Sequence, residues 1–235
     1  MQILIGMVAL IIGYLIGAIP FGLLIVKIKT GKDIRNVESG RTGGTNAMRA
    51  AGFGAGLATA LLDMFKAAAT VWLARWIVPE SPVIHVLAPL AAIIGHNYSI
   101  FLAERDEDGK LKLRGGAGGA PALGGAIGLW GWIFPIAFSA AALVFFTVGY
   151  ASVATMAVPL VVIIIFATRA ALGHAEALWY IWYGVIAEIL LVWALRPNIQ
   201  KLLNGTERVV PTSLHGWIKK RREQRTSQQA TDQPN

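Results

Sequence analysis

Three short polar segments of the chain combine glycine with side chains that can bind an anion. The first, residues 38–49, interleaves three glycines with serine, threonine, asparagine and arginine. Glycine lets the backbone turn and approach a ligand closely, and hydroxyl, amide and guanidinium groups donate hydrogen bonds. The guanidinium of Arg49 has the planar fork that suits a phosphate, and successive backbone N–H groups can form an anion nest. The plainer alternative is a polar loop whose cations only set membrane topology.

The second segment joins Gly95–Ser99 to a glycine-rich stretch at residues 114–121. A glycine-rich stretch that opens a membrane helix presents unpaired N–H groups and a positive dipole end to an anion. It is not a P-loop, because no Gly-Lys-Ser/Thr ends it. The spacing of Gly115 and Gly119 fits close helix packing equally well. His96 is a base, a phosphate donor or a satisfied interfacial histidine.

The third segment, residues 195–207, directly follows the last apolar run. Pro197 is expected to break the helix there, so that Asn198 faces whatever lies at the interface. Arg196 and Lys201 also serve as cationic topology anchors, so this segment is ambiguous on its own.

The elements that carry these segments have the composition of a membrane protein. Of 235 residues, 55% are hydrophobic and 14% charged, whereas soluble domains average about 25% charged residues. The mean hydropathy of +0.58 indicates a bilayer as solvent. A net charge of +8 also occurs in nucleic-acid-binding domains, but these do not carry so much apolar surface, so no nucleic-acid partner is expected. The absence of cysteine excludes disulfides, thiolate catalysis and cysteine-ligated metals.

Seven transmembrane helices are predicted from the apolar runs. The first run has no basic region before it and no cleavage-like site after it, so we expect a retained span and not a signal peptide. The uncharged run at residues 115–168 holds two or three spans, and three gives the count of seven. Its expected turns are Gly131–Pro135 and Gly149–Ser152. The runs are Met1–Val26, Ala50–Ala74, Ser81–Ala103, 115–168 and Ala177–Leu195.

The cations predict the orientation of these spans. Most of the 21 Lys and Arg residues lie in residues 27–54, in residues 102–116 or after residue 195, all on one side of a seven-span chain. Positively charged loops stay cytoplasmic, which places the N-terminus outside and the C-terminus inside. We therefore expect an all-α integral membrane protein whose three polar segments share the cytoplasmic side.

Charges inside the spans and at the end of the chain need separate explanations. Asp63 and Lys66 are i,i+3 neighbours that neutralise each other or a neighbouring helix, whereas Glu188 has no local partner. Residues 1–210 are expected to form the membrane domain and residues 211–235 a basic, disordered cytoplasmic tail. Its cations are either attracted to anionic lipid or only a stop-transfer flank.

Two common catalytic patterns are missing from the chain. None of the four histidines has an aspartate five residues later, which argues against acyltransferases that use such a local His–Asp base. No Gly-x-Ser-x-Gly motif occurs, which argues against an acyl-serine route. An acyl phosphate already carries a good leaving group, so its transfer mainly requires that two anions be held together and a hydroxyl be oriented.

The three segments, in order and spacing, resemble the cytoplasmic motifs of the bacterial acyl-phosphate:glycerol-3-phosphate acyltransferase family (PlsY). The resemblance covers nearly the whole chain, including Ile19–Gly22 and Asp33–Arg35. It implies a seven-span inner-membrane enzyme with Ser39, Arg49 and Asn198 as catalytic residues. The expected substrate-binding residues are Arg41, Thr45, Asn46, His96, Arg114, Gly115, Gly116, Gly118, Ser152 and Glu207.

Three positions depart from the motifs of that family. Arg41 stands where the family has asparagine, Ala117 replaces a phosphate-binding lysine, and Leu195 replaces a histidine. We expect Arg41 and Arg114 to restore the lost positive charge, because arginine binds phosphate at least as well as lysine does.

The resemblance implies that the chain transfers a fatty acyl group from acyl phosphate to glycerol 3-phosphate, giving lysophosphatidic acid for phospholipid synthesis. It implies no cofactor and no metal, and a multi-pass protein of the plasma membrane with a cytoplasmic active site. The expected partners are acyl phosphate, glycerol 3-phosphate, membrane lipids and the soluble enzyme that makes acyl phosphate. The alternatives are a non-catalytic paralogue that binds phosphate-bearing lipid precursors, and a small anion transporter. Binding groups gathered at one interface argue against the transporter.

Overall fold

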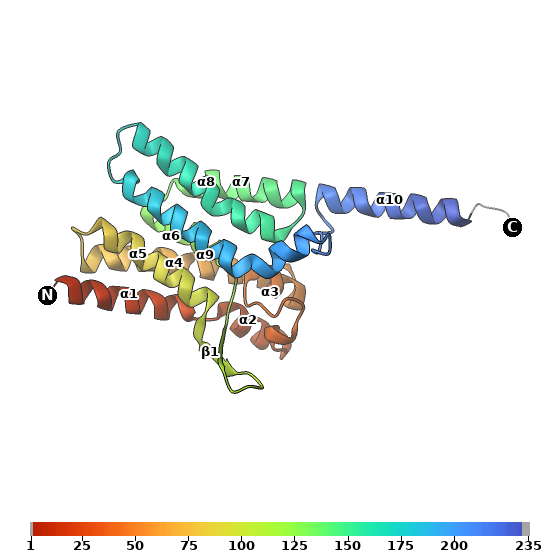
Figure 1. Ribbon diagram of the computed structural model, residues 1–235, viewed down its shortest axis with the longest axis horizontal. Coiled ribbons are helices and arrows are strands. Elements are labelled where there is room, and N and C mark those ends of the chain that lie inside the picture. Colours follow the sequence, from red (N-terminus) through yellow and green to blue (C-terminus); the bar gives the residue numbers. More distant parts are fainter. Residues whose placement is uncertain (1, 232–235) are drawn as a thin grey trace.

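The structure is a computed structural model that describes residues 2–231, a bundle of helices with a β-hairpin at one end (Figure 1). The elements in chain order are α1 Gln2–Ala18, α2 Phe21–Thr30, the 3₁₀ turn η1 Ile34–Asn36, α3 Gly44–Ala51, α4 Phe53–Ile77, α5 Pro82–Asn97, β1 Ser99–Arg105, β2 Leu111–Arg114, α6 Gly119–Leu129, α7 Ile133–Val148, α8 Ala151–Ala171, α9 Ala177–Leu203 and α10 Leu214–Thr231.

The lengths and composition of the helices fit the expected membrane protein. Four segments are long and apolar enough to cross a bilayer, namely residues 3–30, α4, α8 and α9. Helices α5, α6 and α7 are apolar but shorter. The long uncharged run divides into α6, α7 and α8, with Gly131 and Gly149 in the connections. Both expected turns are confirmed in position, but they are shorter than expected, because Pro135 and Ser152 already lie in the first turns of α7 and α8.

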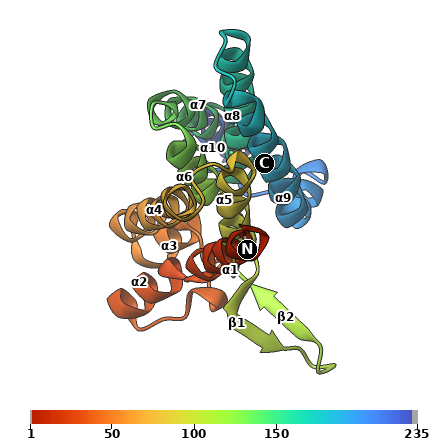
Figure 2. The same cartoon turned by 90° about the vertical axis from the view of Figure 1, so that its left-hand side faces the viewer.

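Strands β1 and β2 form an antiparallel hairpin, which corrects the expectation of an all-α chain. Helix α5 ends at Asn97, inside the run expected to continue as a span to residue 103. The sequence Ile100-Phe101-Leu102 favours strand, and the turn that follows contains Gly109 at a φ of 75°. Figure 2 shows the hairpin standing away from the helices, beside α1.

The first apolar segment is interrupted at Ile19 and Pro20, between α1 and α2. A break inside a bilayer leaves backbone carbonyls that need donors, because no lipid group can supply them. Ser99 Oγ donates to the carbonyl of Ala18 at 2.6 Å, and Lys66 Nζ donates to that of Ile19 at 2.8 Å. The interruption is therefore stabilised by side chains from two other elements.

Helix α9 continues through Pro197, so the prediction that this proline ends the helix is wrong. Proline has no N–H, which leaves the carbonyl of Trp193 without its usual helical partner. Arg196 Nε donates to that carbonyl at 3.2 Å, and Arg41 Nη2 donates to the carbonyl of Ala194 at 2.7 Å. Helix α9 bends instead of ending, as Figure 1 shows.

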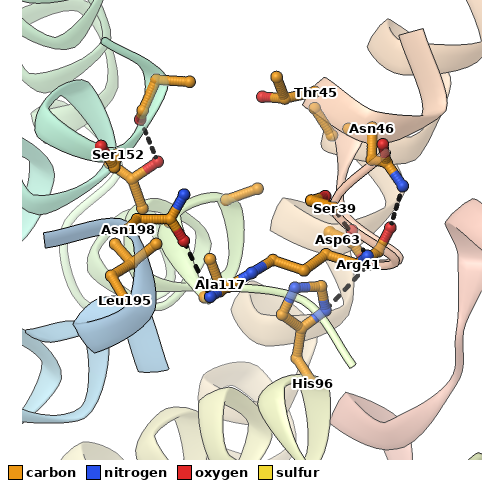
Figure 3. A pocket seen from close by; sticks show the side chains of 18 of the residues that line it. Ser39, Arg41, Thr45, Asn46, Asp63, His96, Ala117, Ser152, Leu195 and Asn198 are labelled. Carbon is orange, nitrogen blue, oxygen red and sulfur yellow. Dashed lines mark hydrogen bonds and ion pairs between the residues drawn. The ribbon is translucent and has the colours of Figure 1, made fainter. Parts of the chain in front are cut away.

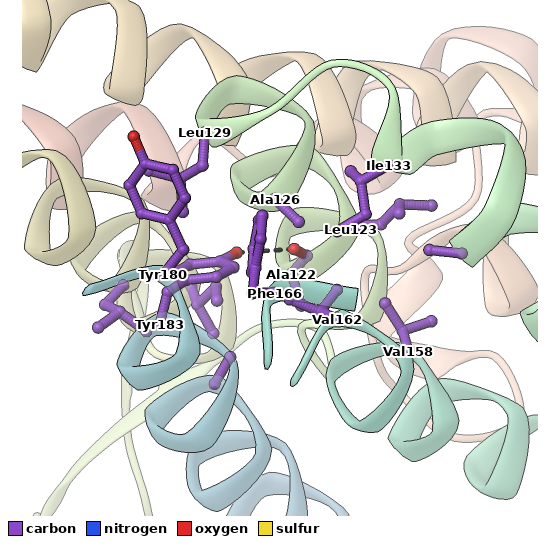
Figure 4. Packing of buried hydrophobic residues seen from close by; sticks show 14 of the residues in the cluster. Ala122, Leu123, Ala126, Leu129, Ile133, Val158, Val162, Phe166, Tyr180 and Tyr183 are labelled. Carbon is purple, nitrogen blue, oxygen red and sulfur yellow. Dashed lines mark hydrogen bonds between the residues drawn. The ribbon is translucent and has the colours of Figure 1, made fainter. Parts of the chain in front are cut away.

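The main hydrophobic core lies where α6, α8 and α9 meet (Figure 4). Tyr183 and Phe166 are fully buried there, and the Tyr183 hydroxyl donates to the carbonyl of Ala122 at 2.7 Å. Glycines bring other helices into direct contact: a Cβ at Gly124 would clash with the carbonyl of Met64 on α4. Close packing of this kind fixes α6, whose first residues line the candidate site.

The connections of the bundle lie at two opposite ends (Figure 1). At one end, Arg75 donates to the carbonyl of Leu129 at 2.8 Å, and Arg169 lies 4.1 Å from the centre of the Trp130 ring. The three polar segments lie at the other end. Helix α10 extends beyond that end, so the segment expected to be disordered is helical as far as Thr231. Its separation from the membrane domain at residue 210 stays a prediction, and residues 232–235 lie outside the described residues.

Candidate functional site

A cavity of about 210 Å³ lies where the three polar segments meet (Figure 3). It opens at the same end of the bundle as the hairpin. Its lining residues come from six helices, α3, α4, α5, α6, α8 and α9, from the loops before α3 and α6, and from the segment after α9. They are Ser39, Arg41, Gly43, Gly44, Thr45, Asn46, Arg49, Ala60, Asp63, His96, Ala117, Gly118, Gly119, Ala120, Ala151, Ser152, Thr155, Leu195, Asn198 and Glu207.

Three helices begin at this cavity. Residues of the first turns of α3, α6 and α8 line it, among them Thr45, Gly119 and Ser152. None of the three helices has a side-chain hydrogen bond that caps its N-terminus. An uncapped N-terminus offers free N–H groups and the positive end of a helix dipole, which together attract anions.

Two arginines add full positive charges to the cavity. Arg41 crosses it, and its Nη2 donates to Asn198 Oδ1 at 3.0 Å (Figure 3). Arg49 makes no hydrogen bond or ion pair with any residue that the structure describes. Partial desolvation lowers the pKa of both guanidinium groups, and in Arg49, which stays exposed, the nearby Arg208 adds to this effect. An anion placed between them would offset both unfavourable effects.

A chain of hydrogen bonds joins the start of α8 to α9 and to the segment after α9. Asn198 Nδ2 donates to Glu207 Oε1 at 3.0 Å, and Ser152 Oγ donates to the same oxygen at 3.3 Å. Arg41 holds the other end of the Asn198 amide. The bend of α9, the loop after it and the start of α8 are thereby fixed relative to one another.

The inner end of the cavity holds a buried cluster of Asp63, Lys66 and His96, three side chains at most 5% exposed. Lys66 Nζ lies 2.8 Å from Asp63 Oδ1 and 3.1 Å from His96 Nδ1. His96 Nδ1 is also 3.5 Å from Asp63 Oδ1. The expected pairing of Asp63 with Lys66 is confirmed. The structure also forms a His–Asp pair that no local motif indicated, because its members lie on α4 and α5.

The glycine-rich stretch packs closely against His96. The backbone N–H of Gly116 donates to the His96 carbonyl at 2.8 Å, and a Cβ at Gly116 would overlap the imidazole ring. The N–H of Thr42 donates to the carbonyl of Gly115 at 3.3 Å. His96 therefore sets the path of the chain into α6, and glycine is required at residue 116 because of this close approach.

The loop before α3 is held by Asn46 and by ion pairs. The buried Asn46 Nδ2 lies within hydrogen-bond distance of the carbonyls of Ile34, Val37 and Arg41, at 3.2, 2.9 and 2.9 Å. Its donor group is thus already used by the backbone. Glu38 pairs with Arg208, which joins this loop to the segment after α9.

Most of the expected site residues lie together in this cavity. They are Ser39, Arg41, Thr45, Asn46, Arg49, His96, Gly118, Ser152, Asn198 and Glu207. The other three, Arg114, Gly115 and Gly116, line a second cavity of about 590 Å³ that also contacts Ser39 and Arg41. Ala117 and Leu195, the two positions that lack a polar side chain, do face the first cavity.

Two features of the site were missed from the sequence. Asp63 lines the cavity although it was expected only to neutralise Lys66, and its position in an apolar helix was the available signal. The start of α8 was expected to contribute only Ser152, whereas Ala151 and Thr155 line the cavity as well. Among the described residues, no group of three His, Cys, Asp or Glu side chains could hold a metal ion.

The chain is similar to glycerol-3-phosphate acyltransferases over most of its length. The profile of the glycerol-3-phosphate acyltransferase family matches residues 7–205. The enzyme of that name from Myxococcus xanthus is 37% identical over 202 residues, which cover 84% of this chain and 96% of the relative. One from Thermus thermophilus is 34% identical over 203 residues, covering 85% of this chain and 92% of the relative.

Two solved structures of PlsY, an integral membrane glycerol 3-phosphate acyltransferase, have the same fold. The glycerol 3-phosphate form superimposes with a TM-score of 0.73 at 27% identity, covering 87% of this chain and 94% of the other. The lysophosphatidic acid form gives a TM-score of 0.70 at 25% identity, covering 88% and 96%.

The buried cluster predicts an unequal response to two substitutions. Lys66→Met leaves the buried Asp63 carboxylate without its cation, so we expect it to lower the free energy of unfolding by about 3–5 kcal/mol. Adding Asp63→Asn should recover part of this loss, because the unpaired charge is then removed. Thermal unfolding of the detergent-purified protein measures both, with the exposed Lys29→Met as control. Equal losses in the single and double variants would contradict this account.

Proposed function

The chain belongs to the glycerol-3-phosphate acyltransferase family, and we propose that the cavity bounded by Arg41 and Arg49 is its active site. The protein transfers a fatty acyl group to glycerol 3-phosphate and makes lysophosphatidic acid, a step of phospholipid synthesis. One observation carries the assignment of the site: three uncapped helix N-termini and two arginines surround a single cavity. This arrangement suits the phosphates of the substrates.

We propose acyl phosphate as the acyl donor. A primary hydroxyl of glycerol 3-phosphate attacks the carbonyl carbon, the bond from that carbon to the phosphate oxygen breaks, and an ester forms. The hydroxyl proton leaves with the departing phosphate, so atoms and charge balance without a covalent enzyme intermediate. Holding both substrates in line supplies up to about 7–11 kcal/mol toward the barrier.

The side chains of the cavity suit distinct parts of this reaction. Arg49 has free donors and binds a substrate phosphate, while the hydroxyl of Ser39 donates to the same anion. Asn198, held by Arg41 and Glu207, presents a fixed amide to the reacting groups. The start of α6 stabilises charge that develops on the acyl oxygen and on the leaving phosphate.

Arg41 supports the proposal that the cavity keeps its positive charge without the lysine at residue 117. Its guanidinium reaches across the cavity to Asn198, and Ala117 lines the same space (Figure 3). Arg114 was expected to share this role, but it lines the second cavity and pairs there with Glu104 at 2.8 Å. We therefore propose that Arg41 alone supplies, in the first cavity, the positive charge that a lysine at residue 117 would give.

We also propose seven spans, with the N-terminus outside and the active site on the cytoplasmic side of the plasma membrane. The support is the distribution of Lys and Arg, which gather at the end of the bundle that holds the cavity. A cytoplasmic site is open to soluble glycerol 3-phosphate and to the soluble enzyme that makes acyl phosphate. The bilayer holds the acyl chain.

The active-site assignment predicts large losses of activity. Ser39→Ala and Arg49→Ala should each lower turnover tenfold or more, since a hydrogen bond to a charged group contributes about 1.5–3 kcal/mol. Both proteins should remain folded and extractable, because neither side chain is buried. Production of lysophosphatidic acid by the purified protein is the measurement, with Arg105→Ala on the hairpin as control. Full turnover in both variants would move the site elsewhere.

If Arg41 supplies the charge that Ala117 lacks, one substitution should remove the binding of glycerol 3-phosphate and a second should restore it. Arg41→Asn should abolish measurable binding of glycerol 3-phosphate to the cavity, because a cation in contact with the substrate is lost. Ala117→Lys in that background should restore binding by placing an ammonium group in the same space. Calorimetric titration of the three proteins tests this. Undiminished binding by Arg41→Asn alone would disprove the compensation, whatever the activity of the enzyme.

The topology predicts which side each connection faces. Reporter fusions at Arg105 and after Asn235 should read cytoplasmic, while a fusion near Pro79 should read external, because Pro79 lies between α4 and α5 at the opposite end of the bundle. A cytoplasmic signal at Pro79 would exclude the seven-span arrangement.

A further inference from the structure

Helix α10 follows the part of the chain that the family profile matches, which ends at residue 205. No described residue of α10 lines the proposed active site or the second cavity beside it. Residues 214–225 carry five Lys and Arg side chains but only one carboxylate, that of Glu223. The helix is therefore strongly cationic and takes no part in the proposed reaction, so its charge needs a partner of another kind.

The start of α10 is fixed to the corner between α7 and α8. The Val210 N–H donates to the carbonyl of Gly149 at 2.7 Å. The ring of Tyr150 packs edge to face against that of His215, with centres 5.4 Å apart. Helix α8, which is long and apolar enough to cross a bilayer, begins directly after this corner. In a membrane, α10 therefore begins at the level of the lipid headgroups.

One face of α10 changes from apolar to cationic along the helix. Leu214, Ile218 and Arg222 follow one another at four-residue spacing, so they form one ridge. Trp217 lies beside this ridge, with the guanidinium of Arg221 at 3.8 Å from the centre of its ring. Leu214 and Trp217 are 54% and 49% exposed. At a rise of 1.5 Å per residue, Arg222 lies about 12 Å beyond Leu214, which is within the sum of the polar region of one leaflet, about 5–8 Å, and a Debye length of about 8–10 Å. The first turn thus suits the acyl chains, while the arginines lie within range of the lipid phosphates.

A cavity of about 320 Å³ lies between this face and the end of α7, past which α10 continues (Figure 1). Its walls are Thr147, Leu214, His215, Ile218 and Arg222. None of these residues lines either of the two cavities described above. The walls combine apolar side chains with a hydroxyl, an imidazole and a guanidinium group, and no carboxylate is among them. Such a site suits a ligand that is anionic at one end and apolar at the other.

We infer that this face of α10 binds an anionic phospholipid of the surrounding bilayer. The lipid phosphate contacts the guanidinium groups of Arg221 and Arg222, and the first carbons of the acyl chains contact Leu214 and Ile218. Trp217 lies at the same interfacial level, where tryptophan is common in membrane proteins. An acidic protein would use the cations but not the exposed apolar side chains, so these favour the lipid. The inference goes beyond the proposed function, because it assigns a lipid-binding surface that holds no reacting group.

Contact quenching of Trp217 tests the inference. The full-length protein is reconstituted into nanodiscs of equal parts phosphatidylcholine and phosphatidylglycerol, with bromine on the acyl chains of one lipid or the other. The signal of Trp217 is the difference between the unmodified protein and Trp217→Phe. We expect brominated phosphatidylglycerol to quench this signal more strongly than brominated phosphatidylcholine does. Equal quenching by the two lipids, or none by either, would overturn the inference and leave an acidic protein as the partner of the cations.

Two double variants of α10 distinguish a binding site from general attraction. Arg221→Gln/Arg222→Gln removes two charges from the proposed face, and Lys219→Gln/Lys220→Gln removes two exposed charges from other positions of the same helix. Titration with phosphatidylglycerol in detergent, followed by native mass spectrometry, measures binding. We expect the first variant to bind about tenfold or more weakly than the unmodified protein, as loss of charged hydrogen bonds implies, and the second to bind as the unmodified protein does. Equal losses in the two variants would overturn the inference, because general attraction depends only on the number of charges.

Thermal unfolding and acyl transfer in detergent are the controls for folding. The substituted side chains are exposed and none lines the proposed active site, so every variant should keep the unfolding temperature and the turnover of the unmodified protein. A nanodisc presents the same lipids on both faces. The quenching result is therefore independent of the proposed orientation in the membrane.

Discussion

The buried ammonium of Lys66 is the constraint on which the polar end of the bundle depends. A charge inside a membrane protein is tolerated only when it is paired and hydrogen-bonded. Lys66 meets this requirement with Asp63 on its own helix, His96 on α5 and the carbonyl of Ile19 between α1 and α2. One side chain therefore fixes three segments. Because His96 in turn determines the path of the glycine-rich stretch, the position of α6 also follows from this burial.

The polar end of the bundle uses the backbone as a source of charge. Helices α3, α6 and α8 begin at the proposed active-site cavity without side-chain caps, so their N–H groups remain available. A positive field is therefore present although residue 117 is alanine. Arg41 supplies a full charge in addition, and its bonds to Asn198 and Ala194 tie it to the bend of α9. Backbone and side chains together therefore supply the positive field of the cavity.

Sequence patterns identified the features that depend on local chemistry. Apolar runs located the long helices, Gly131 and Gly149 marked the turns, and ten expected site residues share one cavity because their segments connect or begin helices at one end of the bundle. What depends on tertiary contacts was not predictable. The course of α9 past Pro197 rests on donors from Arg196 and Arg41, and the pairing of Asp63 with His96 joins residues 33 positions apart. That Arg41 lines both cavities whereas Arg114 lines only the second likewise arises only on folding.

The convergence of α3, α6 and α8 has a thermodynamic consequence for the whole molecule. Helices α3 and α6 have their most extensive contacts with α4, whereas α8 has its most extensive contacts with α9 and also packs against α6. An anion bound at the common point of the three helices is therefore a further non-covalent link between them. By linkage, a ligand that binds only the folded state adds RT ln(1 + [L]/Kd) to its stability, about 2.7 kcal/mol at a hundredfold excess over Kd. In the proposed site, glycerol 3-phosphate would thus raise the equilibrium stability of the folded protein as well as being its substrate.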